Sequence, residues 1–285
     1  MKTQRGFTLI EMAIVLVIIT ILIGGLAVPL SAQIQARRIA ETKKTLDEVR
    51  EAIFGFALSK SILVDHDNNP STPDKNHTYL PCPDLVSGDP PGDADGDGLE
   101  ADINNGLEDR NPDGSCSANA GNVPWATLGT GSQDAWGNRL HYRLTNNLDV
   151  PGPPPVAISM YGRKNGKSFS NSSTGDNQIC KTSSGGCVAG NMASDVPVVL
   201  VSHGPNSRGA RNINIGDGSP TPAAPSETGT GELENLNGDT AYVSRSATDA
   251  NHSDGEFDDL VVWIPHGLII SRICGSVGCT EIPSP

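Results

Sequence analysis

One carboxylate, Glu11, stands inside a long apolar run that extends from Phe7 to Val28. A charged side chain at the centre of a bilayer costs roughly 2.5 kcal/mol or more, so a segment that served only as an anchor would not need it. The chemistry that this position suggests is neutralisation by a cation, and a neighbouring copy of the chain is the expected source. Glu11 is therefore predicted to act in assembly.

A second group of carboxylates alternates with glycine in the segment 92–98. Oxygen ligands suit a hard cation such as Ca²⁺, and glycine lets the backbone turn tightly around it. The EF-hand pattern fails, because its last ligand position, counted from Asp93, is Asn104. A calcium loop of another geometry and a plain solvated acidic loop both remain open. The expected ligands are Asp93, Asp95, Asp97, Glu100 and Asp102.

A further acidic turn, Asp254 to Asp259, leads into the apolar strand expected at 260–264. Its carboxylates are expected to cap the turn, and a second cation site is the alternative. The neighbours Ser202 and His203 suggest nucleophilic chemistry, but adjacent residues on a strand face opposite ways and cannot pair directly. With no Gly-x-Ser-x-Gly elbow and no phosphate-binding loop, the chain is predicted not to be an enzyme.

The composition sets the class of protein. The chain has 285 residues, a formal charge of −13, 32 glycines and 21 prolines. The acidic balance and the lack of a basic patch argue against nucleic acid as a partner. All six cysteines follow the apolar run, and an even count in an exported domain indicates disulfides. Proximity favours Cys180–Cys187 and Cys274–Cys279, which leaves Cys82–Cys116; zinc is disfavoured by the spacings.

These residues must be positioned by a long helix and a globular head. Apolar residues at 39, 46, 49, 53 and 56 form one stripe, which predicts a helix that continues past Pro29 to about residue 59. A kink or local unwinding is expected at Pro29. Strands are expected at 139–144, 156–160, 195–203 and 260–264, with residues 268–270 as the partner of the last. Residues 59–77 are expected to form a loop.

The N-terminal segment resembles that of type IV pilins and type II secretion pseudopilins. The resemblance rests on the leader from Met1 to Gly6, on Phe7, on the run Thr8 to Glu11, and on Pro29. It implies cleavage between Gly6 and Phe7 by a prepilin peptidase, N-methylation of Phe7, and neutralisation of that amine by Glu11 of an adjacent subunit. A second segment, Asp134 to Tyr142, is similar to one in the major secretion pseudopilin.

The resemblance, together with the helix pattern, implies an α+β fold of ladle shape, in which a long N-terminal helix packs on an antiparallel sheet. The expected divisions are 1–6 leader, 7–28 transmembrane or filament-core helix, 29–60 amphipathic helix and 61–285 head. The expected role is a filament subunit of a type IV pilus or secretion pseudopilus, held in the bacterial inner membrane with its head in the periplasm before assembly. The alternative is a minor or tip pilin that acts as an adhesin or calcium-dependent binding module, for which the 209–238 loop is a contact surface.

Overall fold

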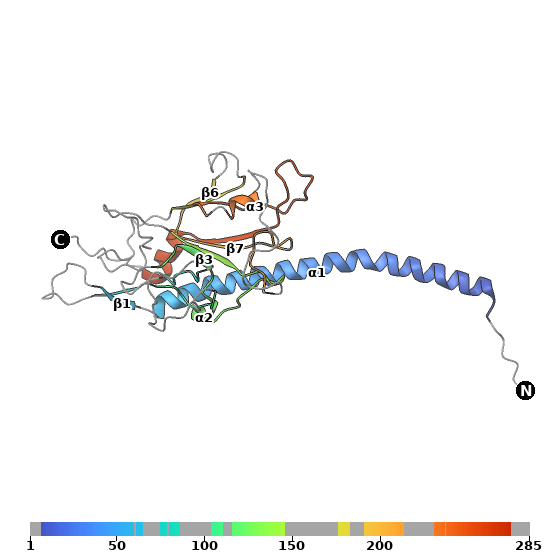
Figure 1. Cartoon of the computed structure of the whole chain (residues 1–285), viewed down its shortest axis with the longest axis horizontal. Helices are drawn as coiled ribbons and strands as arrows, with labels where there is room; N and C mark the ends of the chain where they lie inside the picture. The colour runs from blue at the N-terminus through green and yellow to red at the C-terminus, as the bar shows by residue number, and fades with distance from the viewer. Residues whose placement is uncertain are drawn as a thin grey trace, which may run out of the picture. The chain divides into compact units, whose positions relative to one another are not determined.

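The structure is a computed structural model of the whole chain, and Figure 1 shows its helices and strands. It describes residues 7–59, 61–64, 75–78, 80–85, 104–110, 116–145, 176–182, 191–213, 231–236 and 238–274. The chain divides into two compact units, residues 1–41 and 42–285. Side chains of residues 24–29 lie outside the described part.

The longest element is the helix α1, Leu9–Ser59. The helical backbone continues through Pro29, so the predicted local unwinding is wrong for the isolated chain. Within the second unit, the apolar stripe places Leu46, Val49 and Ile53 at zero exposure. The amphipathic pattern therefore gave the correct buried face.

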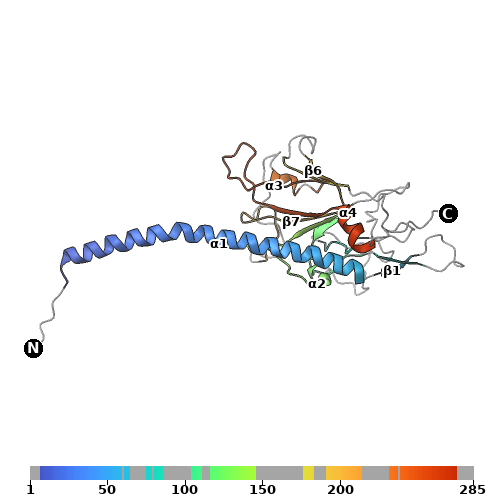
Figure 2. The same ribbon diagram turned by 180° about the vertical axis from the view of Figure 1, so that it is seen from behind.

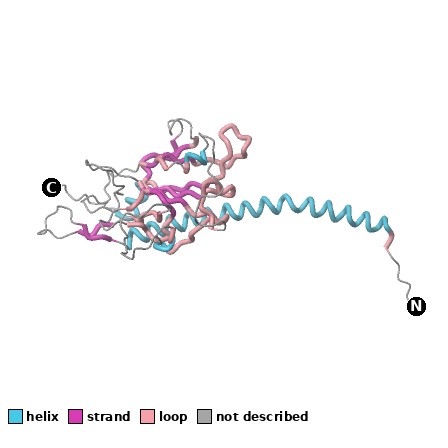
Figure 3. Tube along the Cα trace, viewed as in Figure 1, coloured by secondary structure: helices cyan, strands magenta, loops and turns pink. Residues whose placement is uncertain are grey.

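The head combines short strands with short helical turns, as Figure 3 shows. The strands are β1 (Ser61–Val64), β2 (Lys75–Thr78), β3 (Ala120–Asn122), β4 (His141–Leu144), β5 (Asn177–Cys180), β6 (Asn191–Val196), β7 (Val198–Ser202), β8 (Ala241–Val243) and β9 (Leu260–Ile264). The helical turns are α2 (Trp125–Leu128), α3 (Gly231–Glu234), α4 (His266–Ile269) and the π-helical turn η2 (Ile270–Cys274). The predicted α+β class is correct. The ladle shape is untested, because no arrangement of the two units is defined.

The main sheet has the strand order β3-β4-β7-β9, and all its described pairs are antiparallel. A second sheet has the order β6-β5-β8, in which β5 and β8 run parallel. The strand predicted at 195–203 is confirmed over 198–202 as β7, an inner strand of the main sheet, but residues 195 and 196 belong to β6 of the second sheet. The strand at 260–264 is confirmed as β9. The strand predicted at 156–160 lies outside the described residues.

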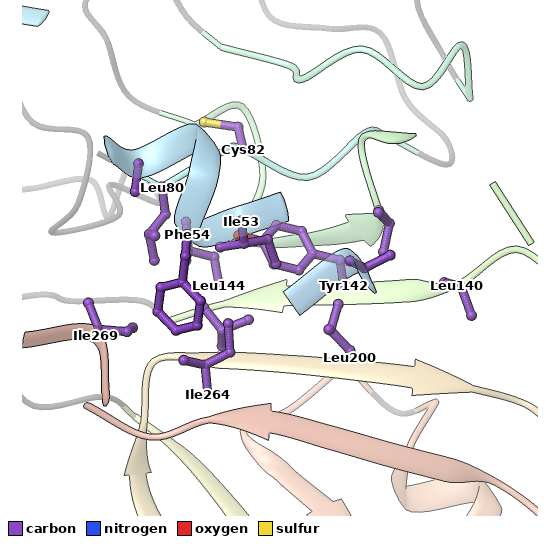
Figure 4. Packing of buried hydrophobic residues seen from close by; sticks show 14 of the residues in the cluster. Ile53, Phe54, Leu80, Cys82, Leu140, Tyr142, Leu144, Leu200, Ile264 and Ile269 are labelled. Carbon is purple, nitrogen blue, oxygen red and sulfur yellow. The ribbon is translucent and has the colours of Figure 1, made fainter. Parts of the chain in front are cut away.

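Strand β7 lies between two apolar clusters, because successive side chains point to opposite faces. Val198 and Leu200 join the cluster that includes Ile53 and Phe54 of α1. Val199 and Val201 join a second cluster, which includes residues of β5 and β8. Figure 4 shows the first cluster, with Phe54 directed toward Ile264 and Ile269. Burial on both faces explains why β7 is a continuous apolar run.

Two predictions for the head are wrong. The segment 59–77, expected as a loop, contains β1 and the start of β2, which pair with each other. The segment 268–270, expected as a hairpin partner of β9, is helical, because the amide groups of Leu268 and Ile269 donate to the carbonyl of Pro265. Proline ends the strand there and provides a helix-compatible φ angle. Figure 2 shows the resulting α4 beside the C-terminal end of α1.

A disulfide joins Cys82 to Cys116, as the sequence predicts. Cys180 is also disulfide-bonded, and its expected partner Cys187 lies outside the described residues, as does the side chain of Cys274. Cys82 and Cys116 both belong to the apolar cluster that includes Ile53 and Phe54 of α1. The bridge therefore fixes two segments that cover the helix.

A fully buried carboxylate, Asp84, lies next to this disulfide in the chain. Its Oδ2 accepts from the amide of Gly106 at 3.2 Å, whereas Oδ1 has no hydrogen-bond partner in the part of the chain that the structure describes. Burial, followed by the nearby Asp109 carboxylate, raises the pKa of Asp84 to about 7. At neutral pH this side chain is therefore close to half-protonated.

The Asp84→Asn variant should lose less stability between pH 5 and pH 8 than the parent chain. Because the folded-state pKa is raised above the unfolded value, the stabilising contribution is present at low pH and is lost as pH rises toward 7. The expected difference is on the order of 2 kcal/mol. Thermal denaturation of the head at both pH values measures it, with the exposed Asp249→Asn as control. Equal pH dependence in both chains would contradict this expectation.

Candidate functional site

The start of α1 is held by Thr8 and Glu11. The Thr8 amide and hydroxyl donate to Glu11 Oε2 at 2.8 and 2.7 Å, and the Glu11 amide donates to Thr8 Oγ1 at 3.3 Å. This reciprocal pattern is a capping box, in which Thr8 caps the helix and Glu11 is its third residue. The carboxylate is thus oriented by its own chain before it meets any partner.

The capping box leaves one carboxylate oxygen available. Within residues 7–59, Glu11 Oε1 accepts no hydrogen bond, since every bond to this carboxylate there goes to Oε2. Among the predicted processing residues, Gly6 lies outside the described residues, and Phe7 is 85% exposed. The role of Thr8 was missed, although the Thr-x-x-Glu spacing before an apolar run is a known signature of a helix start.

The first turns of α1 expose a continuous apolar surface. Fifteen large apolar residues of the described part, from Phe7 to Ile34, are exposed, and Leu9 reaches 89%. Soluble monomers rarely expose an apolar surface of this kind, which marks a contact with protein or lipid. Among the residues that the structure describes, no helix is both long enough and apolar enough to qualify as a membrane span.

The family comparison decides what this N-terminal segment is. Residues 1–27 match the model of the prokaryotic N-terminal methylation motif. The chain carries the prepilin-type signal of type IV pilins and pseudopilins. This signal is a processing and assembly motif of structural subunits and not the mark of an enzyme family. No curated protein and no solved structure matches the chain significantly.

The predicted calcium ligands Asp93, Asp95, Asp97, Glu100 and Asp102 all lie outside the described residues. The head does contain another carboxylate group, which consists of Glu232, Asp258 and Asp259. One oxygen of each lies within 4.8 Å of the others. Asp258 and Asp259 belong to the acidic turn seen in the sequence, whereas Glu232 comes from α3. This third member was missed, because a distant segment brings it in.

Hydrogen bonds hold the three carboxylates in place. The Asn206 amide donates to Asp258 Oδ2 at 3.0 Å, and its side chain donates to Glu232 Oε1 at 2.7 Å. The Asn235 side chain donates to Asp259 Oδ2 at 2.7 Å. Asp258 therefore holds the turn that follows β7, whereas the sequence predicts that these carboxylates cap their own turn, 254–259.

The three carboxylates of Glu232, Asp258 and Asp259 lie close enough to repel one another. Burial, followed by neighbouring carboxylates, raises the pKa of Asp258 to about 7. Burial and Asp259 likewise raise the pKa of Glu232. Among the described residues, Asp258 Oδ1 is buried without a hydrogen-bond partner, and His203 Nδ1, also without one there, lies 3.6 Å from Asp259 Oδ1. Such a group must bind protons or a cation to remain buried.

The pair Ser202 and His203 forms no catalytic arrangement. The Ser202 hydroxyl donates to Asp134 Oδ2 at 2.7 Å, and His203 faces Asp259. Asp134 also accepts from the amide groups of Trp136 and Asn138, which closes the predicted turn at Gly137. Ser202 therefore fastens this turn to β7, and its hydroxyl does not face His203.

Proposed function

We propose that the chain is a structural subunit of a type IV pilus-like or pseudopilus filament. The observation that carries this proposal is the prepilin-type signal over residues 1–27, which coincides with a helix start that presents Glu11 among exposed apolar side chains. The head offers no arrangement of nucleophile and base in its described part that would favour an enzyme instead.

In the proposed mechanism, a prepilin peptidase cuts between Gly6 and Phe7 and methylates the new amine. Glu11 of one subunit then pairs with the Phe7 amine of the next. The capping box supports this step, because Thr8 holds Oε2 while Oε1 is left to accept the ammonium group. A buried carboxylate without such a partner would be strongly disfavoured, so the pairing selects one packing of neighbouring helices.

Before assembly, residues 7–28 would hold the subunit in the inner membrane, with the head in the periplasm. The apolar run supports the first part of this proposal, and the Cys82–Cys116 disulfide supports an oxidising compartment for the head. The partners are then the prepilin peptidase, other pilins or pseudopilins, and further copies of the chain. An adhesive tip role would rest on the 209–238 loop, much of which lies outside the described residues.

The filament role is tested by producing the chain with its assembly machinery and shearing the cells. Electron microscopy with an antibody against the head should reveal labelled filaments in the sheared fraction. If the chain stays in the membrane fraction and no filament is labelled, the proposed role is wrong.

We further propose that the head binds a divalent cation, with Ca²⁺ as the expected ion, at Glu232, Asp258 and Asp259. The observation that favours this is Oδ1 of Asp258, a buried oxygen that lacks a hydrogen-bond partner among the described residues and belongs to a group with two further carboxylates. Oxygen ligands suit a hard cation, which would neutralise the cluster and supply the missing partner. The originally expected ligands at 93–102 remain a separate hypothesis.

Calcium should raise the melting temperature of the parent head and leave that of Asp258→Asn unchanged. With calcium at about 100 times its dissociation constant, the expected stabilisation is about 2.7 kcal/mol. The control is Asp254→Asn, which removes a half-exposed carboxylate from the same turn. A parent head that does not respond to calcium against EDTA, or an Asp258→Asn head that responds equally, would contradict the assignment.

A further inference from the structure

The two charged parts of α1 differ in sign. Residues 30–44 contain four basic side chains and one acidic side chain, Glu41. Residues 45–59 contain three acidic side chains and one basic side chain, Arg50. We call the first set the basic block (Arg37, Arg38, Lys43 and Lys44) and the second set the acidic block (Asp47, Glu48 and Glu51). A basic block therefore precedes an acidic block along one helix.

Both blocks are accessible to a partner. Arg37 and Arg38 are exposed, and neither forms an ion pair within the described part of the chain. The side chains of Asp47 and Glu48 are 57% and 55% exposed. They belong to the face of α1 that turns away from the apolar cluster of the head, since Leu46 and Val49 occupy the buried face. Lys43 and Lys44 are exposed as well, so a neighbouring helix could reach them and the two carboxylates without unfolding the head.

The ion pairs that Asp47 and Glu48 form within their own chain are weak competitors, whereas Glu51 also pairs with Arg272 of the head. Lys44 Nζ lies 3.3 Å from Glu48 Oε1, and Arg50 lies 3.1 Å from Asp47 Oδ1. Exposed pairs of this type, three or four residues apart on a helix, contribute only about 0.3–0.5 kcal/mol each. They can be exchanged for intermolecular pairs at little cost.

We propose that the basic block of one copy contacts the acidic block of a neighbouring, parallel copy and so sets the size of the axial shift between them. This contact presupposes the filament role proposed above. A copy displaced toward the head by four to eleven residues, or about 6–16 Å, places basic side chains beside acidic ones. An unshifted pair of copies does not.

The lower end of this range, a shift of four residues, agrees with the proposed N-terminal pairing and places Lys43 and Lys44 beside Asp47 and Glu48. Phe7 of the displaced copy rises along the helix of its neighbour toward Glu11, which lies four residues further along the chain. The contact is heterologous, because one copy contributes its basic block and the other its acidic block. Head-to-tail contacts of this kind can continue without closing, as a filament requires.

The test is a charge exchange in the assembling, full-length chain. Reversal of the basic block by Lys43→Glu with Lys44→Glu, or of the acidic block by Asp47→Lys with Glu48→Lys, should lower the yield of sheared filaments at least about ten-fold, because like charges then face each other. The chain with all four substitutions should recover to within roughly three-fold of the parent, since the pairs are restored with opposite signs. Lys181→Glu, an exposed charge reversal in the head, should assemble normally.

The outcomes separate this contact from the filament role. A parent chain that forms filaments while both reversed chains assemble equally well overturns the contact alone. A four-substitution chain that is as defective as either reversed chain also overturns it. A parent chain that forms no filaments overturns the filament role itself and, with it, the contact.

Discussion

Filaments should be lost when Glu11 is replaced by glutamine, and the protein should remain in the membrane at its normal level. Glutamine keeps an oxygen that can complete the capping box with Thr8, so the helix start is preserved. What disappears is the negative charge that the Phe7 amine of the next subunit requires. The yield of sheared filaments should fall by roughly a hundred-fold or more, the loss expected when a buried charge is left without its partner.

Comparison of Glu11→Gln with Glu11→Ala separates the two roles of this side chain. Alanine removes both the charge and the cap, and the loss of a cap contributes only about 1 kcal/mol. The two variants should therefore be almost equally defective. If Glu11→Gln assembled like the parent while Glu11→Ala did not, Glu11 would serve as a cap and the charge-pairing mechanism would be wrong.

Removal of the Cys82–Cys116 disulfide should destabilise the head by about 3–4 kcal/mol. The bridge closes a chain segment with a sequence separation of 34, and loop-closure entropy predicts a stabilisation of this size. Both cysteines are also part of the cluster packed on α1, so the segments that they hold would loosen from the helix. Chemical denaturation of the Cys82→Ser, Cys116→Ser head measures the effect.

Reduction supplies the control for this experiment. A reducing agent should lower the stability of the parent head more than that of the variant, because the variant has lost one of the disulfides that can be reduced. A variant as stable as the parent would mean that packing alone holds the two segments in place.

The sequence predicted the elements in which one local pattern dominates. The apolar stripe of Leu46, Val49 and Ile53 determined the buried face of α1, and the apolar runs at β7 and β9 were long enough to indicate strands. The Cys82–Cys116 pair followed by elimination, once the nearer cysteines were paired. In these cases, tertiary contacts agree with the local preference.

The predictions failed where the deciding contact comes from a distant part of the sequence, or where two local patterns favour different structures. Glu232 joins Asp258 and Asp259 because α3 lies against the turn before β9. No local sequence pattern predicts this contact. Residues 268–270 are apolar enough for a strand, but Pro265 starts a helix before them. The Thr-x-x-Glu signature of a capping box is present at Thr8. It was not used, because the cost of a carboxylate in an apolar run pointed only to a role of Glu11 in assembly.

The most direct test of the central claim is the mass of the mature N-terminal peptide from cells that contain the prepilin peptidase. The proposed function predicts a peptide that begins at Phe7 and carries one additional methyl group on its amine. A chain that retains Met1, or one that begins after Ala32, would contradict the assignment of this protein as a prepilin-type filament subunit.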